Sequence, residues 1–288
     1  MQILITGIFL GGVYAIIAVG LSLQYGVARI MNLAVGEMLV AGAFAAFWVY
    51  TAQSLNPYWS LLFVVPGAFI VNWLIYRFLL QPLVRRAKTR GQLEVDSILV
   101  TFGLSFTLVG IFLIVFGGQF FNYSFMSRPV ELFGSRYGQN RVLAFCIAVV
   151  ICGLLWYWLN YTRSGLSLRA VSVDPKAASL VAIDVNKVSA FAFALGGAIA
   201  ATGGVLLSTF LTFDASVGVV FTMKALIIVI MGGVGDIRGA IVAALVLGLT
   251  ETIVARLIDP GLTLASAYFL FLLILLFRPQ GLFGRRTT

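Results

Sequence analysis

Long uncharged stretches alternate with short basic loops along this chain. Residues 38–76 and 97–127 contain no Asp, Glu, Lys or Arg, whereas residues 77–90 between them carry five cationic residues and no acid. Uncharged runs of this length are typical of segments surrounded by the hydrocarbon of a bilayer. The pattern therefore predicts an all-α, polytopic membrane protein.

The apolar runs predict helical spans at 3–27, 36–55, 58–79, 97–118, 142–160, 188–211 and 262–277, with a further apolar segment at 222–255. As a single helix, 222–255 would be about 51 Å long, against a hydrocarbon core of about 30 Å. Residues 232–239 contain four glycines and two charges, and each glycine disfavours helix by about 1 kcal/mol. We therefore predict a break there, a short half-helix that ends inside the membrane before it, and about eight or nine membrane segments in all.

A second interruption lies near the N-terminus, where 29–37 place a cation, an amide, a glycine and an acid between two apolar runs. Glycine-interrupted segments in both halves of a membrane protein indicate a substrate pathway built from broken or re-entrant helices. Freed backbone groups cannot face lipid. We therefore expect Asn32–Glu37 and Gly232–Gly239 to lie close together near the subunit axis, around a shared wet cavity.

The basic residues predict the orientation. Twelve of the 19 lie in three places, namely 77–90, 163–187 and a tail with Arg278, Arg285 and Arg286. Because Lys and Arg in short loops are retained in the cytoplasm, all three places should be cytoplasmic. The chain must then cross an even number of times between 187 and the tail, and breaking 222–255 in two gives four crossings. Counting back through three spans from 77–90 places the N-terminus outside.

Composition agrees with this interpretation and excludes several functions. The chain is 61% hydrophobic and 10% charged, whereas soluble domains are about a quarter charged. Topology explains the net charge of +9 without nucleic acid. There is no histidine, both cysteines lie in one apolar run, and no phosphate-binding loop or hydrolase elbow occurs. We therefore expect no enzymatic activity, no metal and no cofactor, so that any ATP-driven step must use a partner chain.

Ionisable residues at membrane depth usually face a cavity or a partner. Each candidate here has an alternative: Glu37 as a cap of the following helix, Lys224 snorkelling to the interface, and Asp236 and Arg238 in a wet loop. Small residues spaced four apart (Gly196, Ala200, Gly204; Ala240, Ala244, Gly248) indicate packing within the bundle or a subunit interface. The candidate substrate-pathway residues are Gln24, Asn32, Gly36, Glu37, Gly232, Gly233, Gly235 and Glu251.

The loop 161–187 contains a docking candidate. Asp174 and Pro175 are favourable residues at the start of a helix, and the segment 176–184 that follows is amphipathic. Such a helix can lie on the bilayer or occupy a groove of a partner.

Four stretches, in order along nearly the whole chain, resemble the permease subunits of branched-chain amino acid ABC transporters. They are 14–26 (YAIIAVGLS followed by YG), 32–37 (NLAVGE), 174–197 (DPKAA through GG) and the C-terminal pair GGVG with GA at 232–240 and RPQGLF at 278–283. The chain begins directly at its first span, like the shorter of the two permeases in such transporters. One departure is Val35, at a position where the family commonly has histidine.

The resemblance implies a single transmembrane permease domain over 1–288 in a bacterial inner membrane. It implies four kinds of partner besides membrane lipid: a second similar permease, two cytoplasmic ATPases and an extracytoplasmic binding protein. The cargo would be branched-chain or related amino acids, or similar compounds such as amides, urea or aromatic acids. The segment that contacts the ATPase would include Asp174, Pro175, Lys176, Ala177, Ala178, Leu180 and Ile183.

Two other classes of transport protein remain open. An ion-coupled secondary transporter would use buried acids as its coupling site, and Glu37 and Glu251 are the available ones. A channel would need a selectivity ring, and no repeated filter-like motif occurs.

Overall fold

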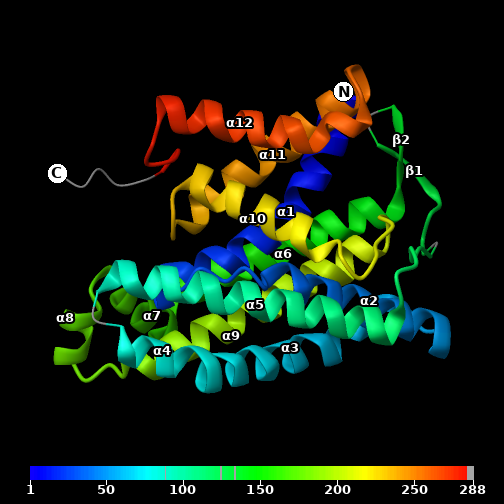
Figure 1. The fold of residues 1–288 in the computed structure, drawn as a ribbon. Helices are drawn as coiled ribbons and strands as arrows, with labels where there is room; N and C mark the ends of the chain where they lie inside the picture. Colours follow the sequence, from blue (N-terminus) through cyan, green and yellow to red (C-terminus); the bar gives the residue numbers. More distant parts are fainter. Residues whose placement is uncertain (88, 124, 133, 284–288) are drawn as a thin grey trace.

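The structure, a computed structural model, describes residues 1–87, 89–123, 125–132 and 134–283, apart from the side chains of 90 and 132. Lys88, Arg285 and Arg286, which contributed to the predicted orientation, lie outside the described residues. The long helices are α1 (Gln2–Ala28), α2 (Val35–Gln53), α3 (Leu61–Ile75), α5 (Arg90–Phe116), α6 (Gln139–Tyr161), α9 (Val185–Ser208), α10 (Gly218–Gly232), α11 (Ile237–Leu257) and α12 (Thr263–Phe277) (Figure 1).

Shorter elements connect them: η1 (Pro57–Ser60), a π-turn η2 (Tyr76–Leu80), α4 (Gln81–Arg86), α7 (Arg163–Val173), α8 (Pro175–Leu180) and η3 (Pro260–Leu262). One antiparallel hairpin, β1 (Pro129–Leu132) with β2 (Ser135–Gly138), interrupts the helices. Within the described residues, eight helical segments are long and apolar enough to cross a membrane, counting 57–86 as one, and α10 is a shorter apolar helix. The predicted polytopic all-α fold is confirmed.

The bundle formed by the described residues has two ends. The end of α4, the helices α7 and α8, and the end of α12 all lie on the left of Figure 1, and this side is called the basic end here. The start of α1, the β1–β2 hairpin and the junction between α11 and α12 lie at the opposite end. This arrangement matches the predicted number of crossings, because α9, α10, α11 and α12 separate the loop 161–187 from the C-terminal segment.

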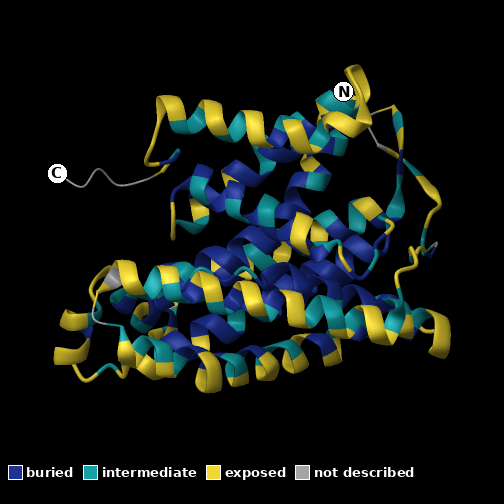
Figure 2. Ribbon diagram, viewed as in Figure 1, coloured by how far each residue is buried: buried dark blue, intermediate teal, exposed yellow. Residues whose placement is uncertain are grey.

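The core is built around α1 and α9, which are buried along most of their length (Figure 2). Glycines allow close approach: a Cβ on Gly20 would lie 2.5 Å from the carbonyl oxygen of Gly196, and one on Gly204 would overlap the backbone of Leu39. A Cβ on Gly248 would likewise overlap the backbone of Gly11. The small residues spaced four apart therefore pack helices within this chain, as one of the two interpretations predicted.

Both predicted breaks are present. Helix α1 ends at Ala28, with Arg29 in the left-handed conformation (φ 57°), and α2 begins only at Val35. Helix α10 ends at Gly232, with Gly233 and Gly235 at φ 107° and 83°, and α11 begins at Ile237. The half-helix prediction is wrong in one respect: α10 ends at the basic end, against the C-terminal segment, and not midway through the bundle (Figure 1).

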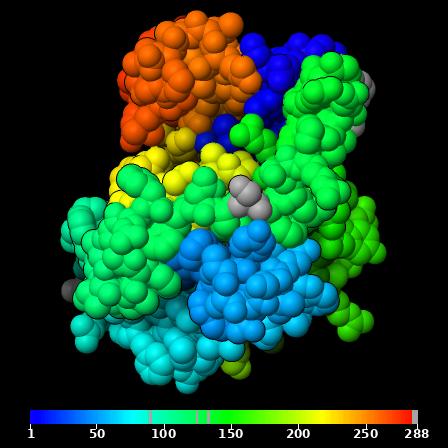
Figure 3. All heavy atoms as spheres, turned by 90° about the vertical axis from the view of Figure 1, so that its right-hand side faces the viewer, coloured from blue at the N-terminus to red at the C-terminus, as the bar shows by residue number. Residues whose placement is uncertain are grey.

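The outer helices carry the large exposed apolar side chains. These include Phe63 and Leu62 on α3, Phe106 and Ile114 on α5, and Phe269 and Leu276 on α12. Water does not tolerate so much exposed apolar surface, whereas lipid or another membrane subunit does. Seen from the end opposite the basic end, the segment that leads into α10 lies recessed between α11–α12 and the green region around 100–140 (Figure 3).

Candidate substrate pathway and coupling surface

The first break is held by side-chain amides. Asn32 accepts a hydrogen bond from the Ala34 N–H (3.0 Å) and donates to Gln24 Oε1 (3.0 Å). Gln24 in turn donates to the Phe193 carbonyl on α9 (2.9 Å). Asn32 and Gln24 are both buried. These predicted pathway residues therefore join α1, the break and α9. Asn32 also supplies a hydrogen-bond acceptor to a backbone N–H that has no helical partner in the break.

Threonine hydroxyls complete the same connection. Thr101 on α5 donates to the Met31 carbonyl (3.0 Å) and accepts from the Leu33 N–H (3.1 Å). Thr222 on α10 accepts from the Gly36 N–H (2.9 Å). Sequence reasoning missed both threonines, because a threonine in an apolar helix gives no signal of a distant backbone partner.

Glu37 lies where α2, α5 and α10 meet. Its side chain is fully buried; Oε1 accepts a hydrogen bond from Ser105 (3.1 Å), and Oε2 has no hydrogen-bond partner among the described residues. A Cβ on Gly218 would lie 2.5 Å from Oε2, and one on Gly36 would overlap the Gly218 carbonyl. Glu37 therefore packs directly against the first turn of α10, which only glycine at 218 leaves open. It lies in the first turn of α2, but no side chain caps this helix, and Glu37 accepts its hydrogen bond from Ser105 on α5; the capping alternative is therefore wrong.

The second break is closed by the C-terminal segment. The N–H groups of Leu282 and Phe283 donate to the carbonyls of Met231 (2.8 Å) and Gly232 (3.0 Å), which end α10. Asp236 caps the start of α11 by accepting from the N–H groups of Arg238 (2.8 Å) and Gly239 (3.0 Å). Carbonyls at the end of a helix have no partner within the helix. The segment 278–283 thus supplies donors to a helix that precedes it by some fifty residues.

Three glycines shape this region. Gly232 packs against the backbone of Gly239, Gly233 against Gly281, and Gly235 against Gly26 of α1. Gly235 also lines a cavity of about 70 Å³ at the basic end, together with Ser22, Leu168, Arg169 and others from α1, α6 and α7. These three predicted pathway glycines therefore lie at one end of the bundle, beside a small space with a mostly apolar lining.

The two breaks do not lie together as predicted. Gly36 contacts Gly218 and Thr222 in the first turns of α10, whereas Gly232 ends that helix. Fourteen residues separate Gly218 from Gly232, which is about 21 Å along a helix. Gly36, at the end of the first break, therefore lies at the opposite end of α10 from Gly232, whereas the end of α1 that leads into this break contacts Gly235 through Gly26. The sequence shows where two helices are interrupted, but it does not show that the length of α10 lies between Gly36 and Gly232.

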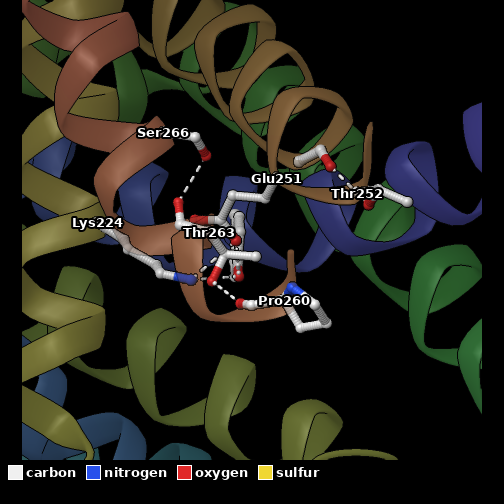
Figure 4. Close-up of polar contacts among 8 residues, drawn as sticks. Lys224, Glu251, Thr252, Pro260, Thr263 and Ser266 are labelled. Atoms are coloured by element: carbon white, nitrogen blue, oxygen red, sulfur yellow. Dashed lines mark hydrogen bonds and ion pairs between the residues drawn. The ribbon is translucent and has the colours of Figure 1, made fainter. Parts of the chain in front are cut away.

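Glu251 belongs to a different cluster (Figure 4). Lys224 Nζ lies 2.9 Å from Glu251 Oε2 and donates to the Tyr14 hydroxyl (2.8 Å), which itself donates to Glu251 Oε2 (2.8 Å). The Lys224 and Glu251 side chains are 12% and 3% exposed. The ammonium also lies 4.9 Å from the centroid of the Tyr14 ring. Lys224 therefore does not snorkel; it ties α10 to α1 and α11.

The predicted coupling residues lie at the basic end. Asp174 caps α8 by accepting from the N–H groups of Lys176 (2.9 Å) and Ala177 (3.3 Å), with Pro175 at the first position of the helix. Ala178 is buried in the main core cluster and Ile183 packs against that cluster, whereas Leu180 is 87% exposed. The neighbouring Val173 and Val181 are also exposed. The exposed apolar surface is therefore formed by Val173, Leu180 and Val181, with Lys176 and Ala177 also exposed, and Ala178 faces its own chain.

Comparison with known proteins agrees with this architecture. Residues 3–278 match the family described as branched-chain amino acid transport system / permease component. The chain is 28% identical to the high-affinity branched-chain amino acid transport system permease protein LivH of Escherichia coli K12, and 26% identical to the corresponding BraD of Pseudomonas aeruginosa. Both alignments cover 99% of this chain and 96% of the relative.

Among solved structures, PsaBC from Streptococcus pneumoniae in complex with Fab is similar in fold, with a TM-score of 0.52 and 13% sequence identity. The alignment covers 98% of this chain and 94% of that one. The helices, the breaks and the family match over nearly the full length lead to one assignment. The chain belongs to the family of permease components of branched-chain amino acid transport systems.

Proposed function

We propose that the chain is one of two permeases in a binding-protein-dependent ABC importer of a bacterial inner membrane. It would pair with a second, similar permease, two cytoplasmic ATPases and an extracytoplasmic binding protein. The family match over residues 3–278 carries this proposal, since it covers every membrane helix. The absence of a nucleotide-binding motif in the sequence is consistent with ATP hydrolysis by a partner.

The cargo would be a branched-chain or related amino acid. LivH and BraD, which are named for branched-chain amino acid transport, support this class. Val35, at a position where the family commonly has histidine, is fully buried in the first turn of α2, two residues before Glu37. Amides, urea or aromatic acids are the other compounds that we would test.

The pathway would run beside the α2–α5–α10 junction. Glu37 would supply a carboxylate near the pathway, with Gln24, Asn32 and Gly36 holding the first break in place. Gly232, Gly233 and Gly235 would shape the basic end, where cargo leaves. Glu251 would act through Lys224, by fixing α10 against α1 and α11. Its buried partner favours this structural role over contact with cargo.

Reconstitution tests the transport mechanism. The chain would be purified with its co-expressed partners, inserted into liposomes and supplied with labelled leucine, isoleucine or valine and the binding protein. Uptake should require both the binding protein and ATP on the side of the ATPases. Uptake that follows a proton or sodium gradient without ATP would instead assign a secondary transporter. Uptake of another labelled compound alone would change the cargo but retain the mechanism.

We expect the basic end to face the cytoplasm, with the C-terminal segment on that side and the N-terminus outside. A cysteine at Ser164 and one at Asp259, each in a chain with Cys146 and Cys152 replaced by alanine, would be labelled with a membrane-impermeant reagent. Asp259→Cys should react from outside and Ser164→Cys only after the membrane is opened. Equal labelling from one face would contradict this orientation.

The exposed surface at α8 would contact an ATPase. Leu180→Glu places a charge on it without touching the core, so the chain should insert normally while ATP hydrolysis no longer drives uptake, which is lost. Ala178→Glu is the comparison, because it buries a charge inside this chain and should reduce the folded yield. Normal coupled uptake by Leu180→Glu would show that the docking surface lies elsewhere.

A further inference from the structure

Three arginines converge where α3 continues into η2 and α4. Pro82 lacks an N–H and cannot bond to the carbonyl four residues earlier, which favours a wider turn at this point. The structure has that wide turn: the Gln81 N–H bonds to the Tyr76 carbonyl, five residues back. Arg77, Gln81, Pro82, Arg85 and Arg86 together line a cavity of about 280 Å³.

None of these arginines is neutralised. Within the part of the chain that the structure describes, the salt bridges involve other residues, and no carboxylate lies within 4.0 Å of the three guanidinium groups. Arg77 lies over the ring of Trp73, with 5.2 Å from its guanidinium carbon to the ring centroid. The cavity thus offers many N–H donors with a net positive charge. Its natural ligand is an anion with several acceptor oxygens, and guanidinium groups match phosphate in geometry.

An apolar surface adjoins the cavity. Phe78, on the same turn as Arg77, is 72% exposed, and Leu74, Val71 and Ile70 continue this surface along α3. These side chains would contact lipid tails, because α3 packs on α9 with its other face. A ligand that fits both features carries a phosphate head and a hydrocarbon tail.

We infer that this cavity binds the headgroup of an anionic phospholipid from the leaflet at the basic end. Basic pockets at the cytoplasmic side of membrane helices are suited to such headgroups. The rule that keeps basic loops in the cytoplasm depends on charge alone. It therefore does not explain why three arginines surround one cavity. The arginines line it from a continuation of α3 that borders lipid, whereas α8 projects further out at the same end (Figure 1). The inference depends on the chain spanning a membrane and not on what it transports.

The experiment is a lipid titration of the purified full-length chain in detergent, followed by native mass spectrometry. The probes are phosphatidylglycerol, phosphatidylcholine with the same acyl chains, and inorganic phosphate as a competitor. The test variant is R77Q/R85Q. The control is R163Q/K187Q, which removes two exposed charges from the same end.

Wild type should bind one phosphatidylglycerol at least tenfold more tightly than phosphatidylcholine. At about fivefold per arginine, R77Q/R85Q should bind it roughly 25-fold more weakly, while the control changes less than twofold. R77K/R85K keeps the charge but loses the guanidinium geometry, so its affinity should lie between those of wild type and R77Q/R85Q. The melting temperature of each variant is measured alongside, and only variants within a few degrees of wild type are compared.

Three results would overturn the inference. Unchanged phosphatidylglycerol affinity in R77Q/R85Q would place the lipid elsewhere. Full displacement by an equal concentration of inorganic phosphate would identify a free anion as the ligand. Unchanged lipid binding with loss of the ATPases on co-purification would assign the cavity to the partner ATPase.

Discussion

Glu251 and Glu37 are both buried carboxylates in membrane helices, yet their surroundings differ. Glu251 Oε2 receives Lys224 and Tyr14 at 2.9 and 2.8 Å, so its charge is balanced. Glu37 receives Ser105 alone among the described residues, and its second oxygen has no partner. Burial of a charge is costly unless it is paired. One oxygen of each carboxylate, Oε2 of Glu37 and Oε1 of Glu251, has no hydrogen-bond partner among the described residues. The two sites therefore differ in the counter-charge: Glu251 has Lys224 beside it and is suited to holding helices together, whereas Glu37 has no cation beside it among the described residues and can receive a cargo or a proton.

The helix α10 separates the two carboxylates. Thr222, which lies at the Glu37 junction, and Lys224, which pairs with Glu251, are two residues apart and so point about 200° apart around α10. A single short helix thus contacts a balanced charge on one side and an unbalanced one on the other. Four substitutions test this comparison.

The largest effect is expected for Lys224→Met. It leaves Glu251 buried without its cation, which costs about 3–5 kcal/mol. The folded yield in detergent and the melting temperature should both fall. The double variant Lys224→Met/Glu251→Leu removes both charges and should recover most of the loss. Equal destabilisation of the single and double variants would show that the pair is not what holds α10.

Gly36→Ala should have the next largest effect. Its Cβ would overlap the Gly218 carbonyl, and such overpacking costs about 1–3 kcal/mol. Gly110→Ala on α5 is the control, since a Cβ there meets nothing within 4 Å. It should leave the melting temperature unchanged or raise it slightly. If both variants melt alike, the close contact of α2 and α10 does not exist in solution.

Ser105→Ala removes the one recorded hydrogen bond to Glu37. Hydrogen bonds to charged groups contribute about 1.5–3 kcal/mol and those to neutral groups about 1 kcal/mol. The larger loss of stability would indicate an ionised Glu37 carboxylate and the smaller loss a protonated carboxyl. A drop in melting temperature that disappears in a Glu37→Gln background would confirm that the two side chains act together. If the losses of stability of Ser105→Ala and Glu37→Gln simply add in the double variant, the two side chains act independently.

The smallest effect on stability is expected for Glu37→Gln. The amide keeps an acceptor for Ser105, and no cation lies against Glu37 among the described residues, so the free energy of unfolding should change by less than about 1 kcal/mol. Glu251→Gln, by contrast, leaves Lys224 poorly paired and should destabilise more. Uptake by Glu37→Gln in liposomes then reports whether the carboxylate serves transport. Unfolding of Glu37→Gln comparable to that of Glu251→Gln would remove the contrast between the two sites.

Much of the architecture follows from local chemistry. Charge-free runs long enough to cross a bilayer predicted the spans, and the glycines at 232–239 predicted the break that divides 222–255. Asp174 and Pro175 predicted the start of α8 correctly. In each case the cause lies within a few residues of its effect: hydropathy, helix propensity and caps act on neighbouring positions, which a single sequence displays directly.

The arrangement of the candidate site was decided by tertiary contacts. Tyr14 meets Glu251 across 237 residues, Thr222 meets Gly36 across 186, and Leu282 caps α10 through Met231. No pattern along the chain encodes these pairs, because they depend on which helix faces pack and at what depth. The sequence by itself therefore determined which segments enter the membrane and where they break. Only the packing of α10 between α1, α2 and α11 decided that, among the described residues, one buried acid lies beside a cation and the other does not.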